Sequence, residues 1–268
     1  MRQRSNPINT PAARRWAVGG ACLGALLATL WGAPAHWLAS GVRWATHERV
    51  QLRDARGTVW TGSALLTLTG GTGSRDQRSL PSRLQWHWGW NSQGLALTLA
   101  TACCTPTPLS LTFSASPRHL DLTLQDQSSV WPMDLLSGLG APWNTLQAEG
   151  QLQWQSTGLR LDWTDGGLRW HGQTEVQVHQ LASRLSTLRP MGSYRLRLQG
   201  SEAGTPTPSL DLDTLQGPLR LSGQGQWLGQ RLRFTGEALA EPDAEVALSN
   251  LLNIIGRRDG ARSLLSLG

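Results

Sequence analysis

The sequence predicts a mainly β protein, an antiparallel β-meander that forms an open curved sheet or a sandwich, anchored by one N-terminal transmembrane helix. Two observations support this class. Over residues 48–268 apolar residues alternate with polar ones in many short runs, and one long uncharged segment precedes them. Alternation places the apolar side chains of a strand on one face and the polar ones on the other. Antiparallel sheets with one solvated face show this pattern.

The uncharged segment begins at Trp16, after four arginines, and no charged residue follows until Arg43. About 20 apolar residues cross a hydrocarbon core roughly 30 Å thick. Arginines on one flank keep that flank in the cytoplasm. We therefore expect a cytoplasmic tail at 1–15, a transmembrane helix at 16–38, a stem at 39–47 and a periplasmic domain at 48–268. The expected anchor residues are Trp16, Leu23, Leu26, Leu27, Leu30, Trp31 and Trp37.

A cleaved signal peptide is the alternative interpretation of the same segment. It would combine the arginine-bearing start, the apolar stretch and the small-residue site Ala33-Pro34-Ala35. Both interpretations export residues 48–268, so the prediction for the compartment does not depend on the choice between them.

Within the exported part, short apolar-alternating runs such as 95–99, 109–113 and 196–198 are separated by turn residues, as at Gly70–Gly73 and Gly217-Pro218. This spacing predicts about 12 to 14 strands. Proline and glycine positions predict short helices at 131–136 and 181–188, and a C-terminal helix or a mixed edge segment at 244–255.

The charge pattern argues against nucleic-acid binding. All 24 basic residues are arginine, and the 20 that follow the uncharged segment face 18 carboxylates. These arginines alternate with leucines on strands, which is typical of a solvated sheet face. The absence of lysine excludes a P-loop lysine and Schiff-base chemistry.

No group of residues has the spacing of an active site. The six histidines are scattered, and Ser63 lacks the second glycine of a nucleophile elbow. Asp211 and Asp213 share one strand face, which favours solvation over a calcium contact. We predict a protein that is not an enzyme and that uses no cofactor and no metal.

Two further features leave alternatives open. Cys103 and Cys104 are adjacent and are either two reduced thiols or a vicinal disulfide. Trp86, Trp88 and Trp90 alternate along one strand, so they share one face. They are either core residues or a strip that binds a partner or a membrane, since tryptophan is enriched at binding hot spots and membrane interfaces.

The segment Gly57-Thr58-Val59-Trp60-Thr61-Gly62 resembles a motif of the protein N family of the type II (general) secretion system. The segments 84–88, 150–154, 191–194 and 255–260 follow in the family's order. The resemblance implies a single-pass protein of the inner membrane of a Gram-negative bacterium, with a periplasmic β domain. Its implied partners are other inner-membrane and periplasmic subunits that export folded proteins across the outer membrane. In physical terms, Gly57 and Gly62 allow close strand approach, and Trp60 is expected to pack the start of the sheet.

The β domain is also similar to AsmA-like periplasmic proteins, which implies a second function in lipid binding or envelope maintenance. The two functions predict different sheets. A concave face lined continuously by leucine and tryptophan favours lipid binding, whereas a closed core with a polar exterior favours a subunit of the secretion machine.

Overall fold

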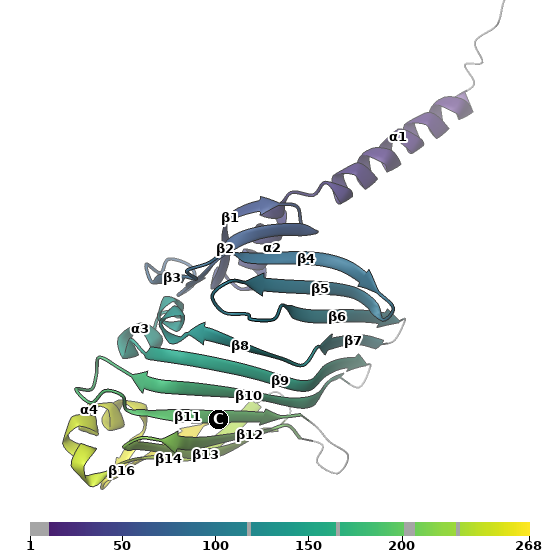
Figure 1. Ribbon diagram of the computed structural model, residues 1–268. Helices are drawn as coiled ribbons and strands as arrows, with labels where there is room; N and C mark the ends of the chain where they lie inside the picture. The colour runs from purple at the N-terminus through teal and green to yellow at the C-terminus, as the bar shows by residue number, and fades with distance from the viewer. Residues whose placement is uncertain (1–10, 117–118, 165–166, 201–206, 229–230) are drawn as a thin grey trace, which may run out of the picture.

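The described residues form a single open antiparallel sheet of 16 strands, and one long helix, α1 (Pro11–Trp31), projects from its N-terminal end (Figure 1). The computed structural model describes residues 11–116, 119–164, 167–200, 207–228 and 231–268. The strands are β1 (Val50–Gly57), β2 (Thr61–Thr69), β3 (Gln77–Ser79), β4 (Leu84–Asn91), β5 (Gly94–Thr101), β6 (Leu109–Ser116), β7 (His119–Leu124), β8 (Gln127–Pro132), β9 (Glu149–Thr164), β10 (Gly167–Ala182), β11 (Gly192–Gln199), β12 (Ser209–Gln216), β13 (Leu219–Leu228), β14 (Arg231–Ala240), β15 (Arg257–Asp259) and β16 (Arg262–Leu267).

The strands follow one another in a meander, because most pair with their neighbours in sequence. The order from one edge to the other is β1-β2-β4-β5-β6-β7-β9-β10-β11-β12-β13-β14-β16-β15, with β3 beside β2 and β8 beside β9. The predicted antiparallel open sheet is confirmed, and the sandwich alternative is wrong. The predicted strand number is too low because β3 and β15 are only three residues long.

The predicted transmembrane helix at 16–38 is wrong as a single helix. The chain instead forms α1 (Pro11–Trp31) and α2 (Ala35–Ala45). Pro34 separates them, because proline cannot donate a helical hydrogen bond and disfavours helical geometry at the residue before it. No helix in the described ranges combines the length and the apolarity that a membrane crossing requires. Residues 1–10 of the predicted tail and the side chains of Leu26 and Leu27 lie outside the described part.

The other helices are η1 (Met133–Leu139), α3 (Trp143–Leu146), η2 (Pro242–Ala244) and α4 (Glu245–Ile255). The C-terminal helix is therefore confirmed, and the helix expected at 131–136 begins only after β8. The helix expected at 181–188 is wrong. Ser183 and Ser186 accept hydrogen bonds from the amides of Leu185 and Leu188, at 3.1 and 3.0 Å. Such serine turns compete with helix formation.

Two clusters of buried side chains lie at opposite ends of the sheet. At the C-terminal end α4 packs Leu248 and Leu252 against Leu219 and Tyr194. The Tyr194 hydroxyl donates to the Leu219 carbonyl at 2.9 Å, and burial raises the pKa of Tyr194. At the N-terminal end α2 packs on the first strands. Its cluster consists of Ala35, Ala64 and Trp86, with Leu38, Leu52, Ala55, Trp88, Leu97 and Leu99 around them.

Cys103 and Cys104 are joined by a disulfide in the turn after β5. Cys104 is buried against Leu80 and Leu135, whereas Cys103 is exposed. The Cys104 carbonyl accepts a hydrogen bond from the Val130 amide at 2.8 Å, so this turn also contacts β8. The disulfide therefore lies in a turn that packs against the rest of the domain.

Candidate functional site

The motif at residues 57–62 is the tight hairpin between β1 and β2. Gly57 has a φ of +88°, and a Cβ there would lie 2.5 Å from the Thr61 carbonyl oxygen. A Cβ on Gly62 would lie 2.5 Å from both the Arg56 carbonyl oxygen and the ring of Trp86. Both positions therefore require glycine, as the sequence analysis expects. The Thr58 amide closes the turn by donating to the Thr61 carbonyl at 2.8 Å.

This hairpin holds the connection between α1 and α2. The Val59 amide donates to the Ala33 carbonyl at 2.8 Å, and Thr58 forms an antiparallel bridge with Pro34. The Trp60 ring nitrogen donates to the Leu30 carbonyl at 2.8 Å. With 39% of its surface exposed, Trp60 does not pack the start of the sheet, so that prediction is wrong. Its ring binds the last turn of α1 instead.

The residue that fills the space under the hairpin is Trp86. It is 3% exposed, and its ring nitrogen donates to the carbonyls of Thr58 and Val59 at 3.2 and 3.0 Å. Trp88 is half-buried against Phe113, and Trp90 is 83% exposed. The three tryptophans therefore do not form one partner surface. Trp86 is a core residue, and of the three tryptophans only Trp90 is exposed enough to contact a partner.

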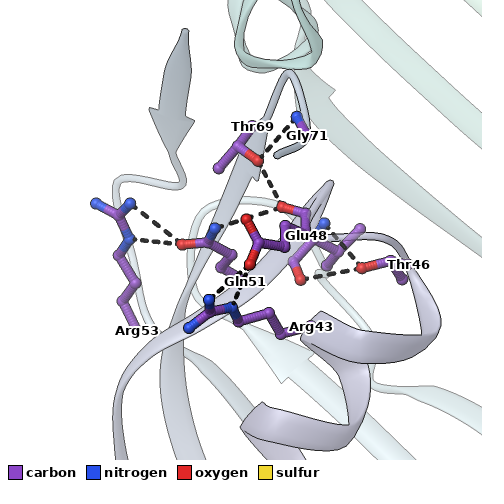
Figure 2. A network of polar contacts seen from close by, with 8 residues as sticks. Arg43, Thr46, Glu48, Gln51, Arg53, Thr69 and Gly71 are labelled. Atoms are coloured by element: carbon purple, nitrogen blue, oxygen red, sulfur yellow. Dashed lines mark hydrogen bonds and ion pairs between the residues drawn. The ribbon is translucent and has the colours of Figure 1, made fainter. Parts of the chain in front are cut away.

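A second attachment holds the C-terminal end of α2 (Figure 2). Arg43 donates to the Glu48 carboxylate at 2.6 Å, and the Glu48 carbonyl accepts hydrogen bonds from the side chains of Gln51 and Thr69. The Thr46 hydroxyl accepts a hydrogen bond from the Val50 amide at 3.1 Å. These contacts join the end of α2 to both β1 and β2. We call the hairpin and this network the neck.

The neck fixes α2 but leaves α1 uncovered. Ala33 and Ala35 are buried at 5% and 2% exposure, so the start of α2 belongs to the folded domain. By contrast, every side chain of α1 whose burial is described, from Arg15 to Trp31, is exposed. In Figure 1, α1 projects away from the sheet. The neck therefore fixes the point at which α1 leaves the sheet.

An ion-pair cluster at a bulge in β1 supports the neck. Asp54 lies at this irregularity, with a φ of 49°. Arg83 donates to the Asp54 carboxylate at 2.7 Å and to the Asp54 carbonyl at 2.6 Å, and Arg56 donates to the same carboxylate at 2.8 Å. These hydrogen bonds, first from Arg83 and then from Arg56, lower the pKa of Asp54 below its ordinary value of 3.8.

The lowered pKa predicts a pH dependence of stability. Because the folded-state pKa of Asp54 is lower than the unfolded value, its contribution is complete above pH 3.8 and is lost as the pH falls further. Asp54→Asn should lower the melting temperature near neutral pH, and this difference from the natural chain should shrink as the pH falls below 3.8. Thermal unfolding followed across this range measures the effect. Asp243→Asn, at an exposed carboxylate without an arginine contact among the described residues, serves as the control substitution.

The Trp60 contact predicts a local effect on α1. Trp60→Phe keeps an aromatic ring but removes the hydrogen bond to Leu30. Hydrogen exchange in a peptide covering residues 28–34 should accelerate, while the melting temperature changes little, because the ring is partly exposed. Trp90→Phe removes the ring nitrogen of another exposed tryptophan and serves as the control. Equal exchange in the two variants would show that Trp60 does not hold α1.

A second surface feature is a continuous apolar face of the sheet. Directly paired residues cross six strands from β4 to β10: Trp90, Leu95, Phe113, Leu122, Leu161 and Trp170. The rings of Trp170 and Trp227 then contact, with centroids 6.1 Å apart. Two strands, β11 and β12, separate them in the sheet order. This ring contact extends the apolar row past β10 to β13. We call this apolar surface the leucine–tryptophan face.

The remaining candidate residues do not come together. Among the described residues, no three His, Cys, Asp or Glu side chains are placed to hold a metal ion. His171 contacts Asp162 at 3.1 Å on neighbouring strands, and Asp213 faces Arg197 at 3.9 Å. Both pairs lie on the polar side of the sheet.

Comparison with known proteins gives a family match. The family described as "Type II secretion system (T2SS), protein N" matches residues 48–264. This range begins at Glu48 of the neck and ends at Leu264, within β16, so it covers nearly the whole sheet. No curated protein and no solved structure matches the chain.

Proposed function

The chain belongs to the protein N family of the type II secretion system, and from this premise we propose that it is a non-catalytic subunit held at the inner membrane. Its sheet would lie in the periplasm and contact other subunits that support the export of folded proteins across the outer membrane. The observation that carries the proposal is the family match over the sheet. The uncovered helix α1, whose uncharged part from Trp16 follows four arginines, supports attachment to the membrane.

The neck supports retention of the N-terminal segment over its cleavage. Cleavage after Ala35 would remove Ala33, whose carbonyl accepts the hydrogen bond from Val59, and would remove Ala35 from the buried cluster. A cleaved chain would lose contacts of its own fold. The N-terminal sequence of the protein purified from membranes tests this point. A mature chain beginning at His36 would contradict the proposal.

The surface proposed to contact another subunit is the turn end of β4. Trp90 is exposed there, and Trp163 and Leu120 of nearby strands are exposed at 61% and 47%. Exposed tryptophans are frequent hot spots of protein interfaces. Trp90→Ala should weaken co-purification of other subunits without changing the melting temperature. Trp163→Phe should weaken co-purification less, because it keeps an aromatic ring on this surface.

The deciding experiment is secretion of a type II substrate in a deletion strain, combined with co-purification from membranes in mild detergent. The proposal predicts reduced secretion, which the natural chain restores, and recovery of other subunits of the machine. Normal secretion together with no recovered subunit would overturn it. The two measurements together distinguish a role in the secretion machine from a general effect on the envelope, because a general effect would reduce secretion without recovery of other subunits.

The leucine–tryptophan face favours a second candidate function, the binding of a lipid chain. The helices α2 and α4 cover the two ends of the sheet, and the row of leucines between them is only half-buried. Leu122→Gln places a polar group in this row, and Thr123→Gln places the same group on the opposite face. Phospholipid recovered with the natural chain and with Thr123→Gln, but lost from Leu122→Gln, would support this function. Absence of lipid from the natural chain would contradict it.

A further inference from the structure

We propose that α2 lies in the membrane interface, with Trp37 and Trp44 inserted between phospholipid headgroups, and that this contact sets the tilt of the sheet relative to the bilayer. The inference rests on the proposed attachment of α1 to the membrane. It adds a second contact, made by a part of the folded domain, and it names the lipid surface that this part recognises.

The first argument is the distribution of side chains around α2. Ala35 and Leu38 face the sheet, whereas Trp37, Ser40 and Trp44 lie on the opposite side at helical spacing. Trp37 is 54% exposed and Trp44 is 84% exposed. A tryptophan ring has a large apolar surface and one polar N–H group, so it is most stable where hydrocarbon meets water. A helix that shows two such rings to solvent matches the composition of an interfacial helix.

The second argument is charge. Residues 36–53, around α2, contain three arginines and one carboxylate, Glu48. Arg43 and Arg49 are exposed at the C-terminal end of α2, beside a hollow of about 560 Å³ lined by Ser40, Arg43, Trp44, Ala45, His47, Glu48 and Thr72. This excess of positive charge is complementary to a bilayer that contains anionic phospholipid. An apolar, positively charged surface fits lipid better than it fits the arginine-rich strands of a second copy.

The third argument is geometry. The uncharged helical part of α1 runs from Trp16 to Trp31, which corresponds to about 24 Å at 1.5 Å per residue. That length is shorter than a hydrocarbon core of roughly 30 Å, and short segments depend on interfacial anchors beside them. Pro34 turns the chain directly after Trp31. The neck fixes α2 at both ends. Trp37 and Trp44 of α2 are therefore held close to the point where the α1 segment would leave the bilayer.

The test uses the full chain in vesicles of phosphatidylcholine and phosphatidylglycerol. In a Cys22→Ser background, Ser40→Cys carries an environment-sensitive fluorophore on the exposed side of α2. Ser92→Cys carries it on the exposed β4–β5 turn as the matched control. Lipids with a quencher near the headgroup should strongly reduce the fluorescence at position 40 and leave that at position 92 unchanged. Adding Trp37→Ala and Trp44→Ala should remove most of the quenching at position 40.

Flotation of the same samples separates this inference from the function on which it rests. If the chain floats with vesicles but position 40 is not quenched, α2 is not in the interface and the inference is overturned, while the attachment through α1 stands. If the chain does not float, the attachment fails and the inference fails with it. Quenching that survives loss of both tryptophans would also overturn it, because another surface would then make the contact.

Discussion

Gly62→Ala is expected to lower the free energy of unfolding by about 2–3 kcal/mol, the upper part of the range for overpacked sites. The added methyl group would lie 2.5 Å from the Arg56 carbonyl oxygen and 2.5 Å from the ring of Trp86. The carbonyl belongs to the backbone of β1, which pairs with β2 at this point, and the ring nitrogen of Trp86 is hydrogen-bonded to the Val59 carbonyl of the hairpin. The ring cannot move away without breaking its hydrogen bonds to Thr58 and Val59. Chemical denaturation of the purified chain measures the loss.

The matched control for this change is Gly89→Ala. Gly89 is also in a strand, but a Cβ there has only ordinary contacts, 3.7 Å or more from the ring of His87. The substitution should change stability by less than about 0.5 kcal/mol. If Gly62→Ala is as mild as Gly89→Ala, the close packing of the hairpin on Trp86 is not a source of stability, and the neck is looser than its geometry indicates.

The local pattern of the sequence predicts the strands well. A strand is defined by alternation over a few residues, so runs such as 95–99 and 109–113 are visible without knowledge of their neighbours. The C-terminal helix α4 is also predicted from a local pattern, the helical spacing of its apolar residues. Short segments without alternation, such as β3, carry no such signal, and the helix expected at 181–188 fails because serine side chains bind the backbone there.

The neck could not be predicted, because it depends on contacts between distant residues. The sequence identifies the hairpin motif, but nothing local indicates that Val59 and Trp60 bind residues 33 and 30. The break at Pro34 was the available signal, since proline after an apolar helix is a probable boundary. Whether Trp60 or Trp86 is buried is decided by where α2 docks, which alternation along β4 does not reveal.

Trp86→Ala is expected to lower the free energy of unfolding by about 3–5 kcal/mol, the usual loss for a large buried aromatic residue. The indole is 3% exposed and packs against Ala35 and Ala64. Its removal would leave a cavity under the hairpin and would also leave the carbonyls of Thr58 and Val59 without their donor. Urea denaturation measures this loss. Trp86→Phe should cost less, because it keeps most of the packing and removes only the hydrogen bonds.

The matched control is Trp90→Ala, because Trp90 lies on the same strand with 83% of its surface exposed and should contribute little. The two variants also separate stability from function. Trp86→Ala should reduce the amount of protein in the cell, and the remaining folded fraction should still bind its partners. Trp90→Ala should leave the amount unchanged. If the two variants lose the same stability, Trp86 does not stabilise the packing of α2 on the sheet, and the backbone contacts of the hairpin and the Glu48 network hold α2 without it.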